Sequence, residues 1–128
     1  MAFIFKNPNP DHNLASDCVI RAISIFFNIT WDEAFVKLSA VAYELKNIME
    51  ANHVWGEYLL RNGLERRQLP NECLNCYTVR DFCNDNPKGS YILATGTHVI
   101  AVIDGNYYDT WDSGDEVPVY YWKWKETN

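Results

Sequence analysis

HVIAVIDGNYYDTW, residues 98–111, is the stretch that decides the predicted fold. Asp104-Gly105 is typical of a two-residue β-hairpin turn, and β-branched or aromatic residues flank it on both sides. Similar short runs lie before and after this stretch. We therefore expect four short strands, at residues 90–95, 98–103, 106–111 and 117–124. Their short connections favour an antiparallel sheet.

The register of this hairpin places a histidine beside an acid. Counting outward from the turn puts Ile103 opposite Asn106 and Ile100 opposite Asp109. Side chains alternate along a strand, so His98 shares a face with Ile100 and is a diagonal neighbour of Asp109. A carboxylate there can orient an imidazole and fix its tautomer. A purely structural histidine–acid pair is the alternative.

The residues before the hairpin are mostly helical. Apolar periodicity and capping signals, such as Thr30 with Glu33, predict four helices. They are expected at residues 16–28, 30–46, 51–61 and 78–84, the first being capped by Ser16 or Asp17. A short strand is expected at 64–69, and the Pro- and Asn-rich residues 1–14 are expected to be loop. Helices followed by an antiparallel sheet indicate an α+β fold, and residues 1–128 are expected to form one domain.

Cys18 is the candidate nucleophile. It lies in the first turn of the most apolar helix, where the helix dipole and unpaired backbone amides favour a thiolate. The same amides can stabilise an oxyanion. The alternative is a small buried hydrophobic residue.

Four segments together resemble a known group of proteins. Residues 17–24 (DCVIRAIS), 30–33 (TWDE), 96–105 (GTHVIAVIDG) and 108–112 (YDTWD) resemble small phage and bacterial papain-like cysteine peptidases, related to the NlpC/P60 and bacteriocin-processing kinds. The resemblance spans roughly residues 13–122. It implies a papain-like fold with Cys18 as nucleophile, His98 as base and Asp109 as the residue that orients His98. Asp112 is a weaker candidate for that third role, because it should point away from the face of His98.

The resemblance also bears on the oxyanion site and the cleft. Papain-like enzymes usually carry a Gln about six residues before the nucleophile, where this chain has His12 followed by Asn13. Asn13, or alternatively His12, is expected to hold the oxyanion together with the Cys18 amide. His12, Asp17 and Trp111 are expected to lie near the substrate cleft. Two tyrosines, Tyr107 and Tyr108, are further candidates for its lining.

A metal site is a weaker interpretation. Cys73 and Cys76 have the spacing of half a zinc site, with Cys83 and His53 as possible further ligands. The second half of a zinc motif is missing from the sequence, so we expect no metal and no cofactor. The aromatic run of residues 120–124 is expected to be mainly core.

Composition limits the partners. The chain has 128 residues and a formal net charge of −6, which argues against nucleic acid as the main partner. No run approaches the roughly 20 apolar residues of a membrane span, and no secretory signal is evident. We therefore expect a cytoplasmic protein with reduced cysteines.

The favoured function is a cysteine hydrolase that cleaves an amide or isopeptide bond in a peptide or protein. Two alternatives remain open: a papain-like module that binds a partner without turnover, and a thiol acyltransferase. The sequence does not fix the oligomeric state.

Overall fold

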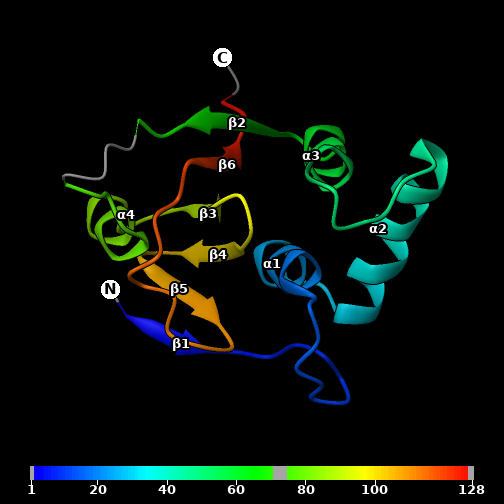
Figure 1. The fold of residues 1–128 in the computed structure, drawn as a ribbon, viewed down its shortest axis with the longest axis horizontal. Coiled ribbons are helices and arrows are strands. Elements are labelled where there is room, and N and C mark those ends of the chain that lie inside the picture. Colours follow the sequence, from blue (N-terminus) through cyan, green and yellow to red (C-terminus); the bar gives the residue numbers. More distant parts are fainter. Residues whose placement is uncertain (1, 71–74, 127–128) are drawn as a thin grey trace.

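The computed structural model describes residues 2–70 and 75–126. Within them the chain forms four helices and six strands (Figure 1). In chain order these are β1 (Phe3–Phe5), α1 (Cys18–Phe27), α2 (Trp31–Leu45), α3 (Asn52–Arg61), β2 (Leu64–Gln68), α4 (Val79–Asp85), β3 (Ser90–Ala94), β4 (Val99–Ile103), β5 (Asn106–Asp109) and β6 (Tyr120–Trp124). The α+β class is confirmed, and none of the described helices is both long and apolar enough to cross a membrane.

The sheet is mixed rather than antiparallel, which corrects one expectation. Its order is β1-β5-β4-β3-β6-β2, and β1 pairs with β5 in parallel while the other pairs are antiparallel. The first residues were expected to be loop, yet Phe3–Phe5 form this edge strand. The Phe3 ring packs 5.6 Å from the Tyr107 ring, an apolar contact that favours the pairing of β1 with β5.

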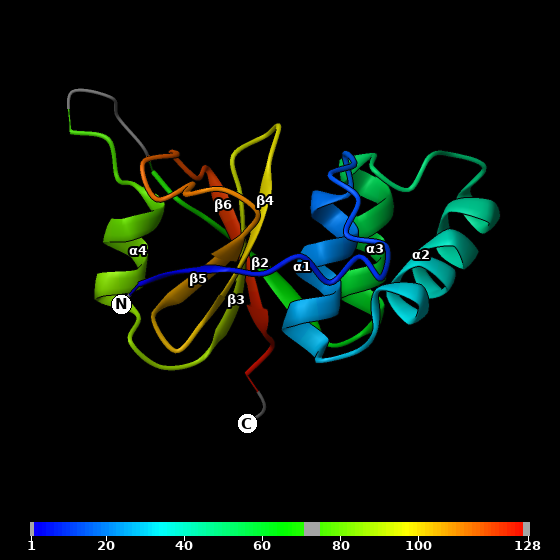
Figure 2. The same cartoon turned by 90° about the horizontal axis from the view of Figure 1, so that it is seen from below.

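Helices cover both faces of the sheet. Figure 2 shows α1, α2 and α3 on one side and α4 alone on the other. In the described residues, a large apolar cluster fills the space between α1–α3 and the sheet, and a smaller one lies beneath α4. α1 packs against β4, and a hydrogen bond between Cys18 and the Val99 amide joins the starts of the two elements.

The hairpin has the predicted register. Ala101 pairs with Tyr108, Val102 with Tyr107 and Ile103 with Asn106. Both turn residues have positive φ, 50° at Asp104 and 78° at Gly105, which is the backbone that a two-residue turn between twisted strands requires.

In the part of the chain that the structure describes, side chains cap the starts of α2 and α4 but not those of α1 and α3. Thr30 accepts a hydrogen bond from the Glu33 amide, as predicted for α2. No side chain among the described residues caps α1, although Asp17 stands at the capping position. The Asp17 carboxylate is bound elsewhere, so the expected cap is wrong and the first-turn amides of α1 stay uncapped.

Candidate active site

The three residues singled out in the sequence meet at one place. Cys18 begins α1 and is partly exposed, His98 directly precedes β4, and Asp109 ends β5. The packing of α1 on β4 brings the cysteine to the histidine, and the β4–β5 hairpin brings the acid.

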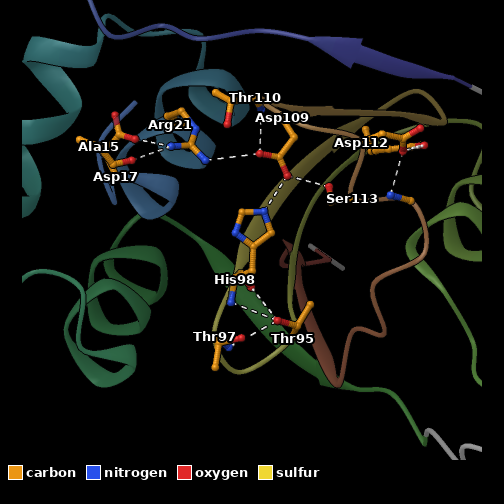
Figure 3. A network of polar contacts seen from close by, with 12 residues as sticks. Ala15, Asp17, Arg21, Thr95, Thr97, His98, Asp109, Thr110, Asp112 and Ser113 are labelled. Atoms are coloured by element: carbon orange, nitrogen blue, oxygen red, sulfur yellow. Dashed lines mark hydrogen bonds and ion pairs between the residues drawn. The ribbon is translucent and has the colours of Figure 1, made fainter. Parts of the chain in front are cut away.

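His98 and Asp109 form a short, enclosed contact. The His98 Nε2 atom lies 2.6 Å from Asp109 Oδ2 (Figure 3), and the two side chains are 13% and 1% exposed. An ionised carboxylate only accepts hydrogen bonds, so His98 donates from Nε2. Its Nδ1 atom is then left for a second partner. The hydrogen bond between His98 and Cys18 therefore uses Nδ1. The Trp111 ring packs 5.1 Å from the imidazole.

The surroundings favour an ion pair between the thiol and the imidazole. Burial alone would raise the pKa of Cys18, but hydrogen bonds from His98 and the Val99 amide, with the charges of His98 and Arg21, lower it overall. Burial likewise opposes the charged form of His98, yet its hydrogen bonds to Asp109 and Cys18 raise its pKa to about 9. A thiolate–imidazolium pair is thus favoured below about pH 9 and above the lowered pKa of Cys18.

Asp109 is held by four donors. Oδ1 accepts from the Thr110 amide at 2.8 Å and from Arg21 at 3.3 Å, and Oδ2 accepts from Ser113 Oγ at 2.6 Å as well as from His98. Burial would raise the pKa of this carboxyl, but the bonds from His98, Ser113 and Thr110 lower it. Asp109 therefore stays ionised and fixed in orientation although it is only 2% exposed.

A buried arginine links this carboxylate to α1. Arg21 is 7% exposed and bridges Asp17 and Asp109, with a longer contact of 3.5 Å to the Ala15 carbonyl (Figure 3). The second oxygen of Asp17 accepts from Trp31 Nε1 at 2.9 Å. Asp17 therefore balances the charge of Arg21 and does not reach the substrate side.

Sequence reasoning did not find the roles of Arg21 and Ser113. The signal for Arg21 was a single charged residue inside the apolar run of α1, four residues after Asp17. Ser113 is fully buried, but its Ser-Gly-Asp context indicated only a turn.

Two cavities lie on either side of the Cys18–His98 pair. The smaller, about 180 Å³, has an apolar floor that includes Val19, Ala94 and Val99. The larger, about 470 Å³, is bordered by Leu14 and Trp111. Both are lined by Ser16, Cys18, Thr97 and His98. A bond placed over the sulfur thus has space on both sides.

Only some of the residues expected near the cleft line the two cavities. Trp111 lines the larger cavity, and its side chain is 46% exposed. The described lining of the two cavities does not include His12, Asn13 or Asp17, nor either tyrosine. Asn13 is exposed, and its carbonyl accepts from the Asn7 side chain at 3.1 Å. The groups best placed for an oxyanion are therefore the uncapped amides at the start of α1.

Asp112 points away from His98. It accepts hydrogen bonds from Tyr107 Oη at 2.5 Å and from the Gly114 amide at 3.1 Å, and it lies 3.5 Å from Arg80. Tyr107 is itself buried beneath α4. Tyr107 lies two residues before Asp109 on β5 and clusters with Ile100, so these contacts are not on the opposite face of the sheet. Asp112 lies beyond the end of β5, and its bonds with Tyr107 and Gly114, not strand alternation, keep it from His98.

The cysteines outside the site were the candidates for a metal site. Cys73 lies outside the described residues, Cys76 is partly exposed and Cys83 is buried, with a pKa raised by burial to about 11. Across residues 2–70 and 75–126, no three His, Cys, Asp or Glu side chains are grouped so as to hold a metal ion.

No protein-family model, curated protein or solved structure was found to match this chain. The geometry of the site itself is therefore the basis for its functional interpretation.

Proposed function

We propose that this chain is a papain-like cysteine hydrolase that cleaves an amide bond in a peptide or protein. The observation that carries the proposal is the enclosed series Cys18–His98–Asp109, in which the thiol at the start of α1 opens onto two cavities. A cysteine with a lowered pKa, a histidine base and a fixed orienting group together match the requirements of nucleophilic catalysis.

The order of these groups supports the papain-like assignment. The nucleophile comes first and begins a helix, the histidine comes later at the start of a strand, and the acid is on the next strand. A helix start supplies both the field that lowers the thiol pKa and the amides that face a developing negative charge.

Each step follows from these positions. The Cys18 thiolate attacks the carbonyl carbon, and the amides of the first turn of α1 stabilise the oxyanion. His98 gives its proton to the leaving nitrogen as the C–N bond breaks, which leaves an acyl thioester on Cys18. His98 then takes a proton from water as the water oxygen attacks the thioester. Collapse of this second intermediate releases the carboxylic acid and restores the thiolate–imidazolium pair. Asp109 stays ionised throughout and holds His98 Nδ1 toward the sulfur.

The test is the pH dependence of Cys18 alkylation by iodoacetamide, followed on the Cys18 peptide by mass spectrometry so that other cysteines do not contribute. We expect rapid reaction at pH 6 in the wild type and slow reaction in His98→Ala. His12→Ala is the matched control, because His12 is exposed and lies outside both cavities. Its profile should equal that of the wild type.

The same experiment addresses the two alternatives. If the wild type and His98→Ala share the profile of an ordinary thiol, the pair is not poised and a binding module without turnover is the better reading. If the pair is poised, amine acceptors added during cleavage of a peptide library distinguish acyl transfer from hydrolysis by the mass of the product.

A further inference from the structure

A further hollow lies between α3 and the sheet, outside the residues that carry the chemistry. It measures about 550 Å³ and runs along one face of α3, past Asn52, Gly56 and Leu60, with Tyr120 and Trp122 of β6 opposite. We call it the α3 groove. It is larger than either cavity beside Cys18.

The α3 groove adjoins the smaller cavity beside Cys18. Asn52 lines both hollows. Ala94 in the floor of the smaller cavity pairs directly with Tyr120 of the groove in the β3–β6 register. The loop between β3 and β4, which carries His98, lies beside α1 (Figure 1). An extended chain over Cys18 can therefore continue into the groove.

The groove offers mainly apolar surface. The packing of α3 on Trp122 depends on Gly56, where an added Cβ would lie 3.3 Å from the indole Cζ2 atom. The charged groups at its edge are already engaged, since Glu57 pairs with Arg61 and the Arg66 guanidinium lies 4.9 Å above the Tyr120 ring. Leu60 adds an exposed apolar side chain, 56% accessible. Such a surface suits a large aliphatic or aromatic side chain.

We infer that the α3 groove binds the acyl part of the substrate and selects a large apolar side chain one to three residues before the cleaved bond. The inference rests on the proposed hydrolase function. The acyl part stays attached to Cys18 as a thioester and benefits from a long binding surface. The leaving amine has to depart, and the larger cavity beside the exposed Leu14 and Trp111 side chains gives it a route.

The experiment uses acetyl-tripeptide vinyl sulfones, in which the Cys18 thiolate forms a C–S bond to the vinyl group and the neighbouring carbon takes the proton from His98. The probes carry Leu or Gly at each of the three positions in turn. We expect Leu to increase the labelling rate about tenfold or more at one position. Leu60→Glu should reduce that preference at least threefold, because it places a charge in the groove.

Two controls separate recognition from reactivity. Val36→Glu introduces the same residue at an exposed site on α2, outside the cavities described, and should leave the preference unchanged. The iodoacetamide rate at pH 6 should be equal in all three proteins.

The outcomes are distinct. Equal labelling by the Leu and Gly probes at every position, with fast iodoacetamide reaction at pH 6, overturns the groove inference and leaves the hydrolase proposal intact. A Leu preference that Leu60→Glu does not change places selection elsewhere and also overturns the inference. Slow iodoacetamide reaction with no labelling by any probe removes the proposed function, and the inference with it.

Discussion

Replacing Asp109 by asparagine should move the proton of neutral His98 from Nε2 to Nδ1. The carboxylate Oδ1 accepts from Arg21 and the Thr110 amide, and neither donor can act as an acceptor. Oδ2 contacts Ser113 Oγ and His98 Nε2, which can both accept. The amide oxygen of asparagine should therefore take the Oδ1 position and its NH2 group the Oδ2 position. His98 then has to accept at Nε2, so its proton moves to Nδ1 and faces Cys18.

The fall in the alkylation rate of Cys18 in Asp109→Asn should be large at low pH and should vanish at high pH. A neutral His98 that carries its proton on Nδ1 cannot accept the thiol proton at that atom. Cys18 should therefore return toward an ordinary thiol pKa of about 8.5. At pH 6.5 such a thiol is about 1% ionised. In the wild type, the lowered pKa of Cys18 and the raised pKa of His98, about 9, both favour the ion pair. The alkylation rate should therefore fall up to about 100-fold at pH 6.5, and by less than about twofold at pH 9.5.

The assay is the iodoacetamide profile of the Cys18 peptide from pH 5.5 to 10. Asp112→Asn is the matched control, since the same change is made three residues later at a carboxylate that contacts Tyr107 and Gly114 instead of His98. It should reproduce the wild-type profile. An unchanged profile in a folded Asp109→Asn protein would refute the view that Asp109 sets the tautomer of His98.

Three further predictions concern stability, measured as the free energy of unfolding in urea. Ser113→Ala removes a buried donor 2.6 Å from the Asp109 carboxylate and should cost about 1.5–3 kcal/mol. An unchanged free energy would mean that the bond contributes nothing net. Arg21→Met leaves the carboxylates of Asp17 and Asp109 buried without their cation and should cost about 3–5 kcal/mol; a neutral result would contradict this. The pKa of His98 is higher in the folded state, about 9, than its ordinary value of 6.5, so its stabilisation is complete below pH 6.5 and is lost as the pH rises through about 9. The loss of stability in His98→Gln should thus be larger at pH 6 than at pH 10, by on the order of 3 kcal/mol, and a difference independent of pH would exclude this linkage.

The hairpin explains why the centre of the site was predictable. Asp104-Gly105 fixes a two-residue turn, and a turn of known length fixes the register on both sides. From that register alone Asp109 follows as the acid on the face of His98, whereas Asp112 lies beyond the end of β5, where the register no longer places a side chain. The position of Cys18 beside His98 did not follow from local rules, because it depends on how α1 packs on β4.

The support around Asp109 was beyond the sequence for a related reason. Arg21 and Asp109 are 88 residues apart, and their contact exists only when helix and sheet are packed together. Asp17 carries a typical capping side chain, but its carboxylate instead forms an ion pair with Arg21 and accepts a hydrogen bond from Trp31. The result is the uncapped helix start that a capping rule would not predict.

The edge strand β1 escaped prediction because three residues are too few for a periodic pattern to be recognised. Pro8 and Pro10 also favour loop in their neighbourhood. The parallel partner of β1 lies about a hundred residues later in the chain, so no local signal joins the two.

That edge strand ties the first residues of the chain to the site chemistry. The Lys6 amide donates to the Asp109 carbonyl at 2.9 Å, and the Tyr107 amide donates to the Ala2 carbonyl at 3.1 Å. The backbone of β5 is therefore clamped along its outer edge by the segment that precedes α1. A protease that trims this segment, or a bulky affinity tag fused to it, would disturb the position of the Asp109 carboxylate that orients His98. The same alteration after β6 would disturb a strand that carries none of the three side chains.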